Sequence, residues 1–67
     1  MEKGWDIVYR TNKQYLADMV KTMLNDNNIE SVIINKKDSV YLIGELEVYV
    51  REEEKEKAMV LIKEFDN

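Results

Sequence analysis

The stretch from Leu46 to Phe65 constrains the fold most, because a strand pattern passes directly into a helix pattern within it. Aliphatic residues stand at every second position in Leu46, Val48 and Val50, which is typical of a strand with one buried face. The period then changes to three- and four-residue steps, which indicates an amphipathic helix with the stripe Ala58, Leu61, Ile62 and Phe65. Since each element has one apolar side, we expect the two sides to pack together.

A first strand is predicted at Trp5–Tyr9, a short segment rich in β-branched and aromatic residues. We expect Trp5, Ile7 and Tyr9 to face the core. The alternate positions carry two charges, so these side chains are expected on the other face: Asp6, Val8 and Arg10.

A helix is predicted next, from a capping box formed by Thr11 and Gln14 to the pair Asn27–Asn28. Asparagine tolerates the left-handed conformation that often follows a helix end. The apolar positions share one predicted face: Tyr15, Leu16, Met19, Val20, Met23 and Leu24. By their helical spacing, the methionines at 19, 23 and 59 are expected to fill the core.

The second strand is predicted at Ile29–Asn35 and the third at Glu45–Val50, with a polar turn at Lys36–Ser39 between them. The segment Val40–Ile43 fits either an extension of the hairpin or an apolar loop. Gly44 permits a bend before the third strand. Acidic residues crowd the start of the last helix, where they favour the positive end of the helix dipole: Glu52, Glu53 and Glu54.

This order of elements predicts a single α+β domain over residues 1–67, a ferredoxin-like βαββα plait. The first helix joins two parallel strands by a right-handed crossover, and the second and third strands form an antiparallel hairpin. The third strand then lies between the other two. We therefore expect a three-stranded sheet of order 1-3-2 with both helices on one face.

Composition removes several classes of chemistry. The chain has no cysteine and no histidine, so disulfides, thiolate metal sites and the commonest general base are absent. Ten basic and fourteen acidic residues give a net charge of −4, which disfavours nucleic acid and anionic lipid as partners. No signal peptide or spanning segment is evident, so a cytoplasmic location is expected. We expect no enzymatic activity, no cofactor and no metal.

Four clusters of residues resemble functional sites, and each has a simpler structural explanation. The acidic run Glu52–Glu54 with Glu56 is a candidate site for a cation such as Ca²⁺ or Mg²⁺. Consecutive carboxylates on a helix point in different directions, so these side chains are expected to be solvated. Glu45 and Glu47 share a strand face at a spacing that would suit a general acid and base pair. Both are expected to face solvent near Arg10 or Arg51, without the apolar pocket that would raise the pKa of an acid. Lys36, Lys37 and Ser39 lack the glycines of a phosphate cradle. A base-stacking surface would use Tyr9, Tyr41, Tyr49, Arg10 and Arg51. The net charge of −4 and the presence of only two arginines argue against it, so cross-strand aromatic packing or a protein contact is expected instead.

Two surfaces remain for a partner in the predicted fold. The first strand lies at an edge of the sheet, with unpaired backbone groups. The sheet face opposite the helices is bare. Binding of a protein partner or of a second copy is therefore predicted there, through the residues Val8, Arg10, Ile33, Glu47, Tyr49 and Arg51.

Several stretches together resemble the small bacterial family of putative prokaryotic signal-transducing proteins, a domain of unknown function: WDIVYRTN, YLADMVKTMLNDNNI, SVIINKKDS, GELEVYV and EEEKEKAMVLI. The resemblance spans nearly the whole chain. It implies a fold similar to the PII-type nitrogen-regulatory proteins and defines no catalytic or ligand residues. It also supplies an alternative function, in which residues 36–44 sense a small ligand.

Overall fold

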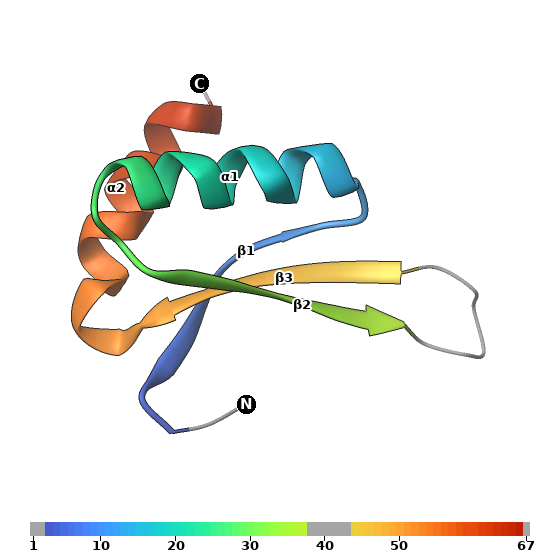
Figure 1. The fold of residues 1–67 in the computed structure, drawn as a ribbon, viewed down its shortest axis with the longest axis horizontal. Coiled ribbons are helices and arrows are strands. Elements are labelled where there is room, and N and C mark those ends of the chain that lie inside the picture. Colours follow the sequence, from blue (N-terminus) through green and yellow to red (C-terminus); the bar gives the residue numbers. More distant parts are fainter. Residues whose placement is uncertain (1–2, 38–43, 67) are drawn as a thin grey trace.

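The computed structural model describes residues 3–37 and 44–66. Its elements follow the order β1, α1, β2, β3, η1 and α2 (Figure 1). Their bounds are β1 Trp5–Thr11, α1 Gln14–Asp26, β2 Ser31–Lys37, β3 Gly44–Arg51, the 3-10 turn η1 Glu52–Glu54 and α2 Lys55–Asp66. The segment Val40–Ile43, whose sequence fits either an extension of the hairpin or an apolar loop, lies outside the described residues.

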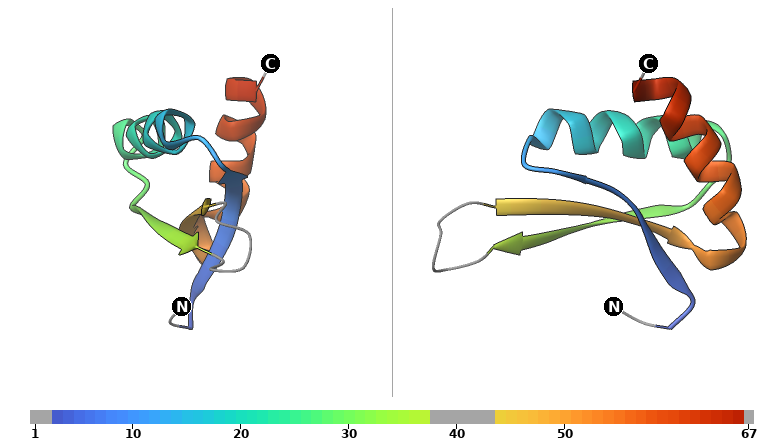
Figure 2. Two further views of the ribbon diagram at one scale, coloured as in Figure 1. Left: turned by 90° about the vertical axis from the view of Figure 1, so that its right-hand side faces the viewer. Right: turned by 180° about the vertical axis from the view of Figure 1, so that it is seen from behind.

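The three strands form one sheet of order β1-β3-β2, and β3 runs antiparallel to both neighbours. Both helices lie on the same side of the sheet, with α1 along the strands and α2 rising beyond it (Figures 1 and 2). This arrangement confirms the predicted βαββα plait. It also places β1 and β2 at the two edges of the sheet.

The core fills the space between the sheet and the helices. The central strand supplies three buried side chains, Leu46, Val48 and Val50. The remaining buried apolar residues come from the elements around it: Val8, Ala17, Val20, Leu24, Ile29, Ala58 and Ile62. The expected packing of the Leu46–Val50 strand against the Ala58 helix stripe is therefore confirmed.

The predicted capping box at the start of α1 is wrong. The helix begins at Gln14, and its N-cap is Lys13, which makes no side-chain capping hydrogen bond. The Thr11 hydroxyl instead accepts a hydrogen bond from the Lys13 backbone N–H at 3.1 Å. The Gln14 amide donates to Asp18 at 3.0 Å, so it does not reach back across the helix start. The two polar residues that suggested a box are used in a local turn and in an i,i+4 pair.

The predicted end of α1 is confirmed and takes the form of a Schellman motif. Asn28 adopts φ 63°, the left-handed conformation. The Ile29 N–H donates to the Leu24 carbonyl at 2.9 Å and the Asn28 N–H donates to Asn25 at 3.0 Å. Leu24 and Ile29 are both buried, which supplies the apolar contact that usually accompanies this motif.

A β-bulge in β1 corrects the predicted facing of that strand. Ile7 pairs with Tyr49 and Tyr9 pairs with Val48, so Val8 is the extra residue between them. The alternation of faces shifts by one position at the bulge. Tyr9 faces the helices as predicted, but Trp5 and Ile7 face the other way.

Two further expectations about burial are wrong. Ile33 lies opposite the buried Val48 and packs against the core, so it is on the helix side and not on the bare face. Met19 and Met59 are 52% and 45% exposed, whereas core positions were expected. Ala17 takes the buried place on α1, because a small side chain allows the helix to approach the sheet closely.

Candidate interaction surface

The sheet has one face that neither helix covers, called here the open face. Residues directly opposite each other in an antiparallel pair share a face, so the register defines its members. Strand β3 contributes the positions that alternate with its buried aliphatic residues. The members are Trp5, Ile7 and Arg10 from β1, Val32, Ile34 and Lys36 from β2, and Glu45, Glu47, Tyr49 and Arg51 from β3.

Of the six residues predicted for partner binding, the structure brings four together on the open face: Arg10, Glu47, Tyr49 and Arg51. The other two belong to the core side. Val8 is only 8% exposed at the bulge, and Ile33 packs between the sheet and the helices. Neither side chain is accessible to a partner on the open face.

Glu47 is the most tightly held side chain of the open face. It is 4% exposed, although it points away from the helices. The Tyr49 hydroxyl donates to its Oε1 at 2.8 Å and Arg10 Nε donates to its Oε2 at 3.2 Å. Lys36 Nζ lies 3.6 Å from Oε1. The expectation that this carboxylate faces open solvent is therefore wrong, because its neighbours on β1, β2 and β3 cover it.

These contacts set the ionisation of the pair. The hydrogen bond from Tyr49 lowers the pKa of Glu47 from its ordinary value, helped by Arg10 and Lys36 and opposed by burial. The same hydrogen bond raises the pKa of Tyr49, because a deprotonated phenol could not donate it. At neutral pH, Glu47 is thus an anion and Tyr49 a neutral donor.

A second cluster lies at the opposite end of the open face. The Arg51 guanidinium carbon stands 4.7 Å from the centre of the Trp5 ring, a cation–π contact. Arg51 Nε also donates to Glu30 at 3.2 Å. The chain's single tryptophan is thus held against the side chain of Arg51.

Two acidic residues of the open face share one cation. Arg10 Nε lies 3.7 Å from Glu45 and 3.2 Å from Glu47, so one guanidinium joins the two carboxylates. A lowered pKa makes Glu47 a poor proton donor at neutral pH. Within the part of the chain that the structure describes, no three acidic side chains converge as a metal site would require.

The sequence places Glu45 on the same strand face as Glu47, but it does not reveal the other five members of the open face: Trp5, Ile7, Val32, Ile34 and Lys36. The bulge reversed the first two, and a bulge leaves no clear signal in a strand without glycine or proline. Strand β2 has apolar residues on both faces, so alternation alone does not show whether Ile33 or Ile34 lies on the open face. Pairing with β3 decides it, because Ile34 lies opposite Glu47.

The alternative site for a small ligand, residues 36–44, falls mostly outside the described residues. Lys36 is described and turns to Glu47. Ligand sensing there stays a prediction.

The fold and the open face together define a small α+β domain of the ferredoxin-like type with one uncovered sheet surface. The chain belongs to a family whose description is "Putative prokaryotic signal transducing protein", and the family model matches residues 5–66. Neither the curated proteins nor the solved structures give a match to this chain. Across the described ranges, no helix is long and apolar enough to cross a membrane.

Proposed function

We propose that this protein is a non-enzymatic signalling module that associates with a second copy of itself through the open face. The family description supplies the signalling context. The single observation that carries the proposal is the pre-built charge cluster around Glu47, on a sheet surface that the fold leaves uncovered.

Charge balance supports a second copy as the partner. The open face and its Glu30 contact contain three cations and three anions: Arg10, Lys36, Arg51, Glu30, Glu45 and Glu47. The whole chain carries −4. This face is therefore balanced in charge although the chain as a whole is acidic, and pairing it with itself brings cations of one copy near anions of the other.

Apolar side chains supply the driving force. Trp5, Ile7, Val32, Ile34 and Tyr49 are all partly exposed between the charged positions. Aromatic residues are the usual anchors of protein contacts, and the branched aliphatic side chains between them add apolar area that a partner can bury. Tyr49 is additionally fixed by its hydrogen bond to Glu47, so little freedom is lost when a partner covers it.

The bulge at Val8 favours the open face over the edge of β1. A bulge interrupts the regular ladder that an added strand needs, and proteins commonly protect edge strands in this way. Strand addition along the whole of β1 would have to match that irregularity. We therefore place the contact on the face, with the β1 edge at most at its rim.

The size of the face sets the expected affinity. Three strands about 4.8 Å apart and about 23 Å long present roughly 300 Å² of sheet surface. A standard stable interface buries about 800 Å² per partner. The association is therefore expected to be weak, with monomer and dimer exchanging between micromolar and millimolar concentration.

Sedimentation velocity tests this proposal. The wild-type protein should show a mass that rises with concentration. Val32→Lys places an extra cation in the face and should give a monomer throughout, and Val60→Lys makes the same change on α2, where Val60 is 60% exposed, and should behave like the wild type. A wild-type protein that stays monomeric at millimolar concentration would contradict the proposal.

A further inference from the structure

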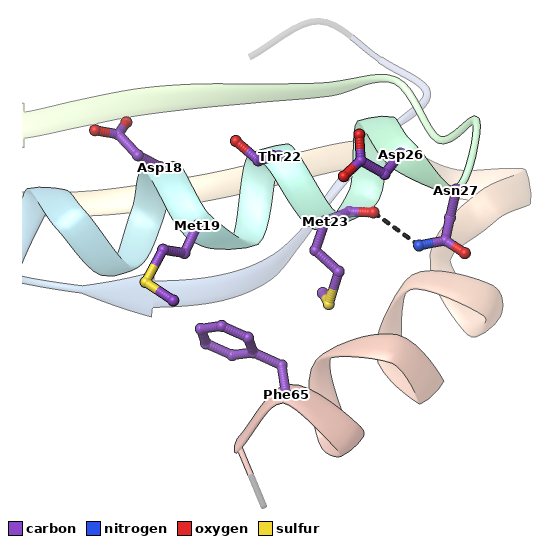
Figure 3. A pocket seen from close by; sticks show the side chains of 7 residues that line it. All are labelled: Asp18, Met19, Thr22, Met23, Asp26, Asn27 and Phe65. Atoms are coloured by element: carbon purple, nitrogen blue, oxygen red, sulfur yellow. Dashed lines mark hydrogen bonds between the residues drawn. The ribbon is translucent and has the colours of Figure 1, made fainter.

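A groove of about 500 Å³ lies between α1 and the C-terminal end of α2. Both helices lie on the side of the sheet opposite the open face (Figure 2). Met19 and Met23 project from α1 toward Phe65 of α2 (Figure 3). Phe65 makes an edge-to-face contact with Tyr9, with ring centres 6.3 Å apart. We call this site the α1–α2 groove.

The exposed apolar residues of α1 extend the groove by one turn. Tyr15, Met19 and Met23 are spaced four residues apart, so they form one row along the helix. Tyr15 is 60% exposed and Met19 is 52% exposed. Met23 is partly buried against the core, so Tyr15 and Met19 are the members of the row that the core leaves exposed. Exposed apolar side chains in a row are a feature of binding surfaces, and methionine side chains adapt to varied partners.

The polar side of the groove carries negative charge. Asp18, Thr22 and Asp26 form a second row on α1, on the side away from Phe65 (Figure 3). Among the described residues that line the groove there is no lysine or arginine. The end of the groove is formed by Asn27, whose amide donates to the Met23 carbonyl at 2.8 Å.

From these observations we infer that the α1–α2 groove binds an amphipathic helix of another protein, with a basic polar face. The apolar row receives the helix's apolar stripe, whose residues recur at the same spacing. The carboxylates of Asp18 and Asp26 then face lysine or arginine side chains beside that stripe.

The protein's own helices do not match this chemistry, so a second copy is not the expected occupant. Helix α1 has one lysine against two aspartates. Helix α2 has three lysines against three acidic residues. An anionic membrane surface is also disfavoured, because the aspartates beside the groove would be repelled by it.

Two designed peptides test this inference on the full chain. Each has about 14 residues, or roughly four helical turns, with leucine on one face. One carries lysine on the polar face and the other carries glutamate. Fluorescence anisotropy of the labelled peptides near physiological salt should give at least about tenfold tighter binding of the lysine peptide. The methyl NMR signals of Met19 and Met23 should shift on binding, while that of Met59 stays in place.

Matched variants separate the groove from general attraction to an acidic chain. Met19→Lys and Met59→Lys add the same charge at two exposed methionines on different helices. We expect Met19→Lys to weaken binding by at least about tenfold and Met59→Lys by less than about twofold. The pair Asp18→Asn and Asp26→Asn should reduce the preference for the lysine peptide and leave circular dichroism unchanged.

Several results would overturn the inference. An equal loss of affinity for the lysine peptide in both methionine variants would show that only the net charge of the chain attracts the peptide. Equal affinities of the wild-type protein for the two peptides would show an apolar contact that does not select for charge. Absence of binding, or shifts confined to the open face, would remove the groove as the site. The open-face variant Val32→Lys should bind the peptide normally, so failure here is distinguishable from failure of self-association.

Discussion

Tyr49 donates its phenolic hydrogen to Oε1 of Glu47 at 2.8 Å, two residues earlier on the same face of β3. The bond links a buried anion to an aromatic ring that is partly exposed on the open face. Because both residues lie on the central strand, their positions are fixed by pairing on both sides. The same bond therefore helps to stabilise the sheet and fixes the position of the Tyr49 ring on the open face.

Acid should weaken the fold through Glu47. Its pKa is lowered from 4.5 in the folded protein, so its contribution to stability is complete above about pH 4.5 and is lost as the pH falls through the lower folded value. Glu47→Gln should reduce the free energy of unfolding by about 1 kcal/mol at pH 7. The difference from wild type should shrink toward pH 3, as measured by urea unfolding.

Glu45→Gln is the matched control for this prediction. The Glu45 side chain is 53% exposed and lies 3.7 Å from Arg10, so its ion pair is screened by solvent. It should change stability at pH 7 by less than Glu47→Gln. Equal effects of the two substitutions would show that burial of Glu47 does not matter.

The helix end at Asn28 should be sensitive to backbone conformation. Asn28 has φ 63°, a value that an ordinary side chain adopts only at a cost of about 1–2 kcal/mol. Asn28→Ala should therefore lower the melting temperature, whereas Asn28→Gly should preserve or raise it. Thermal unfolding by circular dichroism distinguishes the two, and a harmless Asn28→Ala would contradict the Schellman geometry.

Leu24 and Met19 should respond very differently to truncation, although both were expected in the core. Leu24 is fully buried, so Leu24→Ala should cost about 2–5 kcal/mol. Met19 is 52% exposed, so Met19→Ala should change stability by less than about 0.5 kcal/mol. Denaturant unfolding measures both, and a large loss at Met19 would mean that its side chain is buried.

Ser31 offers a stabilising substitution. Its side chain is 6% exposed, and its hydroxyl oxygen has no hydrogen-bond partner within residues 3–37 and 44–66. Burial of an unpaired hydroxyl costs free energy, so Ser31→Ala should raise stability by up to about 1 kcal/mol. The melting temperature should then rise by about 4–8 °C for each kcal/mol in a domain of this size. A lower melting temperature would show that the hydroxyl is bound.

The overall architecture was predictable because the spacing of the apolar residues and the residues that end each element indicated the same strands and helices along most of the chain. The alternation of Leu46, Val48 and Val50 and the helical stripe from Ala58 gave the central strand and last helix. The Asn27–Asn28 pair marked the end of α1. Once the element order was known, chain connectivity led to the sheet order.

The details of the surface were less predictable, because they depend on contacts between strands. The bulge at Val8 exchanges the faces of Trp5 and Ile7, and it becomes visible only when β1 is paired with β3. Burial of Glu47 arises from side chains on three strands. Exposure of Met19 depends on how α1 packs against the rest of the fold, which helical spacing alone does not reveal.

Self-association through the open face can be followed residue by residue in a dilution series monitored by amide NMR. Between millimolar and micromolar protein, we expect signal shifts concentrated at Trp5, Ile7, Ile34, Glu47 and Tyr49, with little change along α1. Signals that stay fixed on dilution, or shifts that cluster at Met19, Met23 and Phe65 instead, would contradict it.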